Sequence, residues 1–172
     1  DHAFVMVPAS AVPNAIADCC AGRVRVATIF SAGFAETSDE GMRRQLEMVA
    51  MARAAGLRLL GPNCLGIVNV QGHVTLSANA VLEQEALRPG GLSVVSQSGS
   101  MLGAIITRAQ ERGLGFSKLA SVGNECDIGV GELVDLLVDD PATRLNLLFL
   151  ETLRVAPVLA AAARPPYAVA KP

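Results

Sequence analysis

Short apolar runs alternate along the chain with longer stretches in which apolar residues recur at helical spacing. The runs predict strands at 2–8, 23–32, 57–60, 92–95, 116–121, 145–150 and 167–170. The intervening stretches predict helices at 12–21, 38–56, 101–112, 131–138 and 155–163. Because strands that alternate with helices of this length imply βαβ crossovers, we expect an α/β fold with parallel sheets.

The stretch from Val70 to Pro89 has a mixed composition that is typical of a connection between two units. We therefore predict a first unit at residues 1–75, a connection at 76–89 and a second unit at 90–172. Both units show the same βαβ rhythm, and the sequence contains no short repeat or heptad pattern.

The composition supports this fold class and narrows the choice of partners. Of the 172 residues, 51% are hydrophobic but only 3% are aromatic, so the core must consist of Ala, Val, Leu and Ile packed between helices and sheets. The net charge is only -2, and Lys and Arg do not cluster. These features argue against binding to nucleic acid or to an anionic membrane, and they favour small-molecule partners.

Cysteine usage and hydropathy indicate the compartment. The four cysteines show no metal-ligand spacing, which predicts reduced thiols and no metal site. The uncharged run from Pro89 to Thr107 contains too many Ser, Gln and Gly residues to span a bilayer, and the sequence has no signal-peptide pattern. We therefore expect a soluble, cytoplasmic protein.

A run of small polar residues, Ser-Gln-Ser-Gly-Ser at 96–100, stands where a predicted strand passes into a predicted helix. Ligands of open α/β sheets collect at such positions, because the first N–H groups of the helix are unpaired and its dipole favours an anion. Ser98 can cap the helix, and Gly99 allows the backbone to approach a ligand. The run therefore predicts a phosphate-binding turn.

Two other interpretations of this run do not involve phosphate. Capping serines and a glycine that packs on a neighbouring strand would give the same pattern without any ligand. A serine-hydrolase nucleophile elbow is disfavoured, because Ser96 and Ser100 occupy the positions of its glycines and no histidine follows Ser98.

Other candidate residues also follow predicted strands. Glu151 ends an apolar strand, where its carboxylate can orient an imidazole or a cation, or merely complement a helix dipole. Cys64 follows a Gly-Pro-Asn turn and is by default a buried structural thiol. In "SVGNECDIG", Asp127 is expected to cap the helix that begins near Gly129. A solvated helix face is expected for Glu132, Asp135, Asp139 and Asp140.

Several motifs together resemble the NDP-forming acyl-CoA synthetase family, whose members are relatives of the succinyl-CoA synthetase α subunit. These motifs are "VPA", "FSAGFAE", "GLRLLGPNCLGI", "VVSQSGSM", "GLGFSKLASVGNECDIG" and "DDPATRLNLLFLETLR", and their order and spacing agree with the family over nearly the whole chain. The resemblance implies part of a Rossmann-like CoA-binding domain at 1–75, followed by an incomplete flavodoxin-like ligase-CoA domain at 90–172. It also implies a ligase that makes acyl-CoA from a carboxylic acid, CoA and NTP through acyl phosphate and phosphohistidine.

The resemblance also implies a role for each of the site residues. The path of the CoA pantetheine would be lined by Pro8, Phe30, Ser31, Ala32, Asn63 and Cys64. The N–H groups of Ser98, Gly99 and Ser100 would hold the phosphate of phosphohistidine, and Glu151 would hydrogen-bond that histidine. Coenzyme A is the implied cofactor, together with ATP or another NTP whose Mg²⁺ is bound mainly by regions outside this chain.

The sequence departs from the family pattern at both ends. The first strand and Gly-rich turn of the CoA-binding domain do not precede Asp1, and no histidine follows Ser98. We therefore expect the chain to act with the remainder of a longer polypeptide or with a nucleotide-grasp subunit, in an oligomer, and to be inactive alone. The alternatives are a ligand-sensing regulatory module of a protein lysine acetyltransferase, or a CoA-binding subunit without activity of its own.

Overall fold

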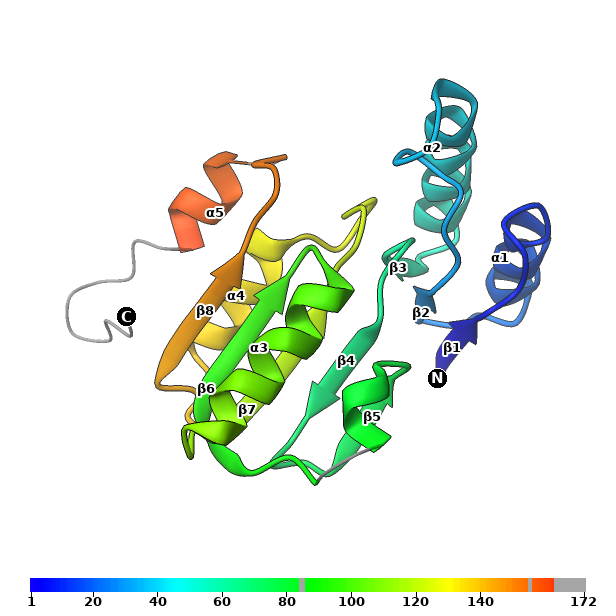
Figure 1. Ribbon diagram of the computed structural model, residues 1–172. Helices are drawn as coiled ribbons and strands as arrows, with labels where there is room; N and C mark the ends of the chain where they lie inside the picture. Colours follow the sequence, from blue (N-terminus) through cyan, green and yellow to red (C-terminus); the bar gives the residue numbers. More distant parts are fainter. Residues whose placement is uncertain (84–85, 155, 163–172) are drawn as a thin grey trace.

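The computed structural model of the protein describes residues 1–83, 86–154 and 156–162. Two α/β units follow one another along the chain, each with its own sheet (Figure 1). The expected α/β class is therefore confirmed. The strand predicted at 167–170 lies outside the described residues.

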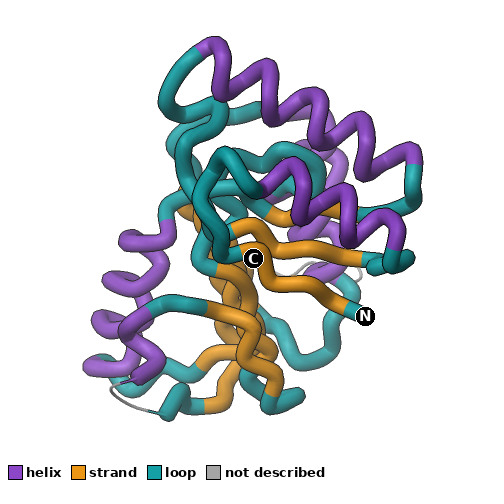
Figure 2. Tube along the Cα trace, turned by 90° about the vertical axis from the view of Figure 1, so that its right-hand side faces the viewer, coloured by secondary structure: helices purple, strands orange, loops and turns teal. Residues whose placement is uncertain are grey.

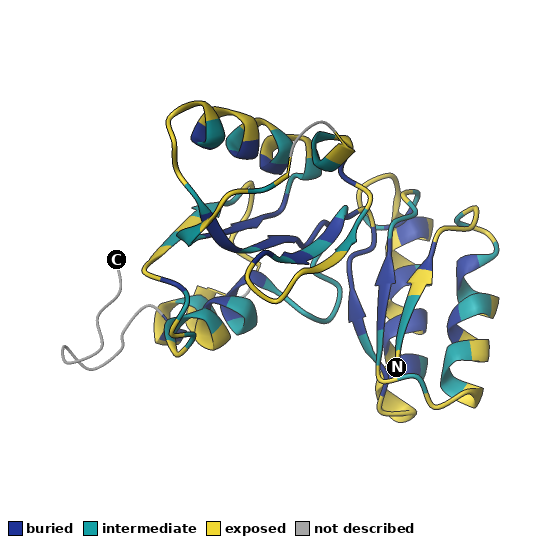
Figure 3. Cartoon of the chain, turned by 90° about the horizontal axis from the view of Figure 1, so that it is seen from below, coloured by how far each residue is buried: buried dark blue, intermediate teal, exposed yellow. Residues whose placement is uncertain are grey.

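The first unit is a three-stranded parallel sheet covered by two helices. Its strands are β1 (His2–Val5), β2 (Val26–Ile29) and β3 (Arg58–Leu60), in the order β1-β2-β3. Helices α1 (Val12–Ala21) and α2 (Asp39–Ala54) connect them. Because both right-handed crossovers advance in the same direction across the sheet, both helices lie on the same face, where the buried side of each helix meets the strands (Figure 3).

The second unit contains three parallel strands with helices on both faces. Strands β6 (Pro89–Ser96), β7 (Phe116–Ser121) and β8 (Leu145–Phe149) lie in the order β7-β6-β8. Helix α3 (Gly99–Glu111) runs from β6 to β7, whereas α4 (Val130–Val138) returns past β6 to β8. The two crossovers therefore run in opposite directions and place α3 and α4 on opposite faces (Figure 1). The short helix α5 (Ala156–Ala162) packs against α4.

An antiparallel hairpin completes the second sheet, so this sheet is mixed rather than purely parallel. Strand β4 (Gly66–Asn69) pairs with both β5 (Val74–Ser77) and β7, in antiparallel register each time. The 3-10 helix η1 (Ala80–Glu83) then lies against α3. Residues 66–77, which the sequence assigned mostly to the first unit, thus hydrogen-bond within the second sheet; the division at 75 and 90 itself stays a prediction.

In the view of Figure 2, most strands lie towards the centre of the picture and most helices lie around them, although the two sheets are separate. The sequence predicted the helices at 12–21, 101–112 and 131–138 to within two residues at each end. A helix long and apolar enough to cross a bilayer is absent from the part of the chain that the structure describes.

Candidate functional site

The carboxyl ends of strands from both units face one cavity of about 360 Å³. Its walls consist of Phe30, Asn63, Cys64, Leu65, Gln97, Ser98, Gly99, Ser100 and Glu151. In the second unit it lies at the carboxyl ends of the neighbouring strands β6 and β8, beside the start of α3, and ligands of open α/β sheets collect at such strand ends. It brings together all the predicted phosphate-side residues and three of the residues predicted for the CoA side.

The amino end of α3 forms one wall of this cavity. Ser98 is the N-cap, and its Oγ accepts a hydrogen bond from Met101 N at 3.3 Å and lies 3.1 Å from Ser100 Oγ. The Ser98 N–H donates to Ser96 Oγ at 3.1 Å and is therefore occupied within the turn. Among the described residues, no acceptor is present for the N–H groups of Gly99 and Ser100, which are the first two of the helix. The geometry thus leaves two of the three predicted amides free for an anion.

Packing explains why position 99 is a glycine, in addition to its place in the cavity wall. A Cβ atom at this position would lie 2.6 Å from both Cγ and Cδ1 of Leu65. Leu65 directly follows Cys64, so the start of α3 rests on the turn that comes from the first unit. The packing interpretation and the ligand interpretation of this glycine therefore apply at the same residue.

Glu151 lies just beyond β8, beside the start of α3. Its backbone N–H donates to Gln97 Oε1 at 2.6 Å. Its side chain is exposed and, within residues 1–83, 86–154 and 156–162, makes no hydrogen bond or ion pair. The carboxylate is therefore available to a group that enters the cavity.

Gln97 is a site residue to which the sequence analysis gave no role. It is 7% exposed, and its amide makes four hydrogen bonds. The Oε1 atom accepts from the N–H groups of Glu151 (2.6 Å) and Thr152 (2.9 Å). The Nε2 atom donates to Thr152 O at 2.7 Å and to the Glu125 carboxylate. Its place between two serines in the polar run was the only sequence signal, because every partner is distant in the chain.

The first unit contributes the opposite wall. Asn63 N donates to Ser31 O at 3.0 Å, and Ser31 Oγ donates to Val7 O, so the ends of all three strands are tied together. The Phe30 ring stacks on Phe4 with a centroid separation of 5.6 Å. Pro8, Ser31 and Ala32, which were also predicted for the CoA path, belong to the same strand ends but do not line the cavity.

The Cys64 side chain is buried at the base of this wall. Its Sγ donates to Ile29 O at 3.4 Å. Burial raises the pKa of Cys64 to about 11, so the thiol stays protonated at neutral pH. This is the environment of a structural thiol rather than of a nucleophile.

The loop between β7 and α4 joins the two units. Three of its N–H groups donate to carbonyls after or within β3: Asn124 to Pro62, Cys126 to Gly61 and Ile128 to Leu59. The Asn124 side chain, which is buried, donates to the Glu36 carboxylate and to Gln45 Oε1 (3.1 Å). Glu36 in turn accepts from the N–H groups of Gly33 and Phe34. The turn "FSAGFAE" is thus held in place by a residue of the second unit.

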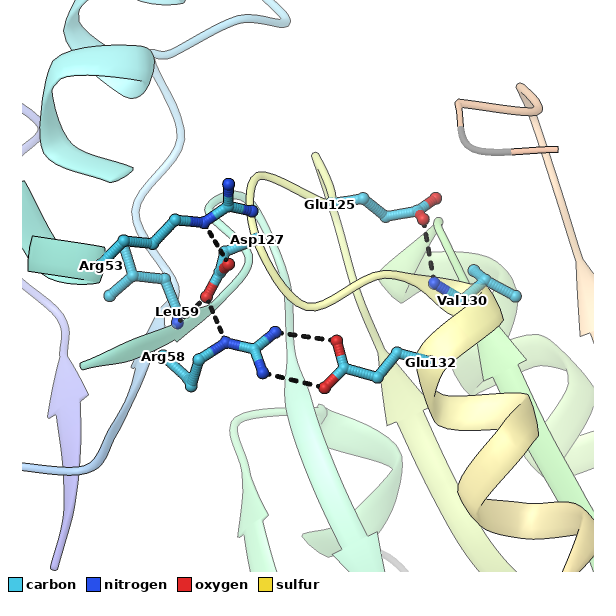
Figure 4. Close-up of polar contacts among 7 residues, drawn as sticks. All are labelled: Arg53, Arg58, Leu59, Glu125, Asp127, Val130 and Glu132. Atoms are coloured by element: carbon cyan, nitrogen blue, oxygen red, sulfur yellow. Dashed lines mark hydrogen bonds and ion pairs between the residues drawn. The ribbon is translucent and has the colours of Figure 1, made fainter. Parts of the chain in front are cut away.

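Asp127 does not cap α4, contrary to expectation. Its carboxylate accepts from Leu59 N at 2.9 Å, from Arg58 Nε at 2.8 Å and from Arg53 Nε at 2.9 Å (Figure 4). Burial alone would raise the pKa of Asp127, but these donors together hold it below its ordinary value. The N–H group of Val130, at the start of α4, is instead bonded by Glu125 Oε2 at 2.9 Å.

Two of the acidic residues predicted to be merely solvated also have partners. Glu132 accepts two hydrogen bonds from Arg58, and Asp140 pairs with Lys118 Nζ at 2.9 Å. In the described ranges, no cluster of three or more His, Cys, Asp and Glu side chains has a geometry that could hold a metal ion.

Comparison with known proteins gives matches over both units. Residues 1–70 match the family model described as a CoA binding domain, and residues 89–172 match that of the succinyl-CoA ligase like flavodoxin domain. An ADP-forming acetate–CoA ligase I of Archaeoglobus fulgidus is 34% identical over 88% of this chain and 22% of its own length. The α subunit of the ADP-forming acetate–CoA ligase I of Pyrococcus furiosus is 35% identical over 88% of this chain and 32% of its own length.

A solved structure agrees with these matches. The apo form of the dinucleotide forming acetyl-coenzyme A synthetase 1 of Ca. Korarchaeum cryptofilum superimposes with a TM-score of 0.86 at 27% identity, covering 95% of this chain and 35% of that one. The present chain therefore spans between about a fifth and a third of the length of the relatives that it matches.

Proposed function

Because the chain belongs to the NDP-forming acyl-CoA synthetase family, we propose that it supplies the CoA-binding and phosphate-handling parts of an enzyme that makes acyl-CoA. The substrates are a carboxylic acid, CoA and ATP or another NTP, and the phosphoryl group passes through acyl phosphate and phosphohistidine. The histidine, the nucleotide and its Mg²⁺ are contributed by the remainder of the protein or by a partner subunit. The site of action is the cytoplasm.

One observation carries this proposal: a single cavity contains the free amides of α3, the Glu151 carboxylate and the turn residues of the CoA-binding unit. A phosphoryl group at the start of α3 would thus lie in the same open cavity as a thiol arriving along Phe30 and Asn63. Such proximity is what transfer of the acyl group from an acyl phosphate to the CoA thiol requires, with inorganic phosphate as the leaving group.

The free amides can stabilise negative charge at the start of α3. The N–H groups of Gly99 and Ser100 point from the positive end of the α3 dipole. An anion gains about 0.3 to 1 kcal/mol from such a dipole, and up to about 2 kcal/mol when the site is partly buried. The N–H groups also remain aimed at the phosphoryl oxygens while charge moves during transfer, which lowers the barrier.

Glu151 has the properties of a residue that orients an imidazole. A carboxylate that accepts the N–H of one ring nitrogen leaves the lone pair of the other nitrogen free to attack phosphorus. CoA supplies the attacking thiol in the final step. Cys64 stays protonated beside that thiol, so it does not compete with CoA for the acyl group.

The proposal is tested with the complete protein that contains this chain. Incubation with γ-labelled ATP is expected to give acid-labile, base-stable phosphate on the protein, and addition of CoA with a panel of carboxylic acids is expected to discharge it with formation of acyl-CoA. Absence of both protein-bound phosphate and acyl-CoA would overturn the enzymatic proposal. Calorimetry with CoA would then separate a CoA-binding subunit, which binds, from a sensing module for another ligand, which does not.

A further inference from the structure

Gln97 occupies an unusual position at the centre of the second unit. It directly follows β6, and its buried amide contacts both of the neighbouring strand ends, at Glu125 beyond β7 and at Glu151 and Thr152 beyond β8. No other side chain in the described part of the chain hydrogen-bonds to the backbone of Glu151 or Thr152. Gln97 is thus the point at which three strand ends are fixed relative to one another.

The chemistry of these contacts requires a primary amide. A Gln side chain has two N–H donors and an oxygen with two lone pairs, and here each of the four is used. A carboxylate would lose both donors and would face the carboxylate of Glu125. An apolar side chain would remove the one side-chain acceptor that the N–H groups of Glu151 and Thr152 have in the described part of the chain.

Gln97 also lines two cavities. It lines the 360 Å³ cavity that contains Glu151 and the start of α3, and it lines a second cavity of about 230 Å³ together with Glu125, Thr152 and Val130. The backbone of Glu151, an exposed residue after β8, is therefore hydrogen-bonded to a buried side chain. A shift of the Gln97 side chain would move Glu151 relative to Gly99 and Ser100.

We propose that Gln97 is a positioning residue, which holds the Glu151 carboxylate at a fixed distance from the phosphate-binding amides of α3. This inference rests on the proposed function, because it assigns importance to Glu151. The side chain of Gln97 does not itself touch the phosphoryl group. It sets the geometry, and a misplacement of about 1 Å at a reacting centre is sufficient to slow a reaction by about a hundredfold.

The test uses the complete protein and a pair of variants with opposite expectations. Gln97→Met keeps the length of the side chain but removes all four hydrogen bonds. It is expected to lower kcat by about tenfold to a hundredfold, while KM for CoA changes by less than about threefold, because the side-chain hydrogen bonds of Gln97 go to Glu125, Glu151 and Thr152 and not to Phe30 or Asn63. Hydrogen exchange at the amides of Glu151 and Thr152 is expected to accelerate by at least about tenfold.

A second pair of variants exchanges the amide at position 97 and the carboxylate at position 125. Recovery of activity in the double variant would show that loss of folding does not explain the defect. Gln97→Glu places two carboxylates together and is expected to be at least as impaired as Gln97→Met. Adding Glu125→Gln restores a donor and an acceptor between positions 97 and 125, and it still leaves an oxygen for the Val130 N–H. The double variant is expected to recover part of the kcat that Gln97→Glu loses. Gln110→Met is the matched control, since Gln110 accepts from Arg88 N at the far end of α3.

The outcomes distinguish the catalytic positioning role of Gln97 from its structural role in fixing the strand ends. A faster exchange at residues 151 and 152 with unchanged kcat would overturn the positioning role, and unchanged exchange would overturn the structural claim. A kcat that falls equally in the Gln110→Met control would show a general effect and would also overturn the role. If the wild-type protein forms no acyl-CoA, the proposed function fails, and the positioning role in that reaction fails with it; the exchange measurement then still decides whether Gln97 fixes the strand ends.

Discussion

Arg58, at the start of β3, donates two nearly parallel hydrogen bonds of 3.0 and 2.8 Å to the carboxylate of Glu132 in the first turn of α4 (Figure 4). The same guanidinium donates from Nε to Asp127, whose side chain is only 2% exposed. A residue of the first sheet thus binds two carboxylates of the second unit. These contacts join the first unit to the second.

Replacement of Arg58 by Ala is expected to destabilise the protein. Both carboxylates lose a charged donor, but the guanidinium is partly exposed, so we expect the free energy of unfolding to fall by about 1 to 2 kcal/mol. Urea denaturation measures the change. Arg108→Ala, which removes an exposed pair with Glu111, serves as the control and should cost less than about 0.5 kcal/mol. Equal losses in the two variants would contradict a special role of Arg58.

Asp127 should make the free energy of unfolding depend on pH in the acidic range. Its pKa is lower in the folded protein than in the unfolded chain, where an Asp has a pKa of about 3.9. The unfolded state therefore binds more protons in this range, and the stabilisation is present above the unfolded pKa and lost as the pH falls through the folded pKa. Asp127→Asn is expected to be less stable than wild type at pH 7 and to lose less stability on acidification below about pH 5. Unfolding free energies measured across this range would contradict the assignment if both proteins had the same slope.

Local patterns were sufficient to predict the alternation of strands and helices, but they did not predict the hairpin of β4 and β5. The segment "GIVNVQGHVTLS" contains its own signal, since two short alternating runs flank a turn with Gly72. Its mixed composition favoured a connection instead. Which sheet such a hairpin joins depends on the pairing of β4 with β7, and that contact spans about fifty residues of sequence.

A methyl group at Gly99 should disturb the start of α3. Its Cβ would lie 2.6 Å from the Leu65 side chain, so Gly99→Ala is expected to cost about 1 to 3 kcal/mol of stability and to weaken protein phosphorylation. Leu65→Ala in the same protein removes the clash and is expected to restore part of the phosphorylation. A double variant no better than Gly99→Ala would show that the contact with Leu65 is not the cause.

Cys64 should be unreactive in the folded protein. With a pKa of about 11, about one thiol in a thousand is ionised at pH 8. Alkylation by iodoacetamide at this pH is expected to be at least about a hundredfold slower at Cys64 in the native protein than in the urea-unfolded protein, as followed by peptide mass spectrometry. Cys64→Ser is expected to retain acyl-CoA synthesis within about threefold. Rapid native alkylation with loss of activity would instead indicate a reactive thiol.

Glu151 should matter for the rate and not for CoA binding. Glu151→Gln keeps the size of the side chain but removes the negative charge. Loss of this charge is expected to lower kcat by about a hundredfold or more. Calorimetric affinity for CoA should stay unchanged. Glu111→Gln, on the exposed end of α3, is the matched control. A loss of CoA affinity without a change in kcat would place Glu151 in the CoA site.

The sequence was sufficient to predict the site residues at the strand ends. It was not sufficient to predict the hydrogen bonds that hold them in place. Small and polar residues after apolar strands pointed to Ser98, Gly99 and Glu151, because parallel strands present their carboxyl ends at one edge. The hydrogen bonds that hold these residues are long-range, and Gln97 reaches Thr152 across 55 positions. Helical periodicity marked Glu132 as a surface residue, which is correct for its exposure but says nothing about a guanidinium from another sheet.

The loop after β7 binds the two units through adjacent residues, Asn124 toward Glu36 and Gln45, and Glu125 toward Gln97. Two adjacent residues thus link the turn that contains Glu36 to Gln97, which hydrogen-bonds Glu151. A chimera in which either half is taken from a relative would therefore have to carry matching acceptors for position 124 and a matching amide for position 125. Grafts that ignore this pair would join two intact folds around a misaligned cavity.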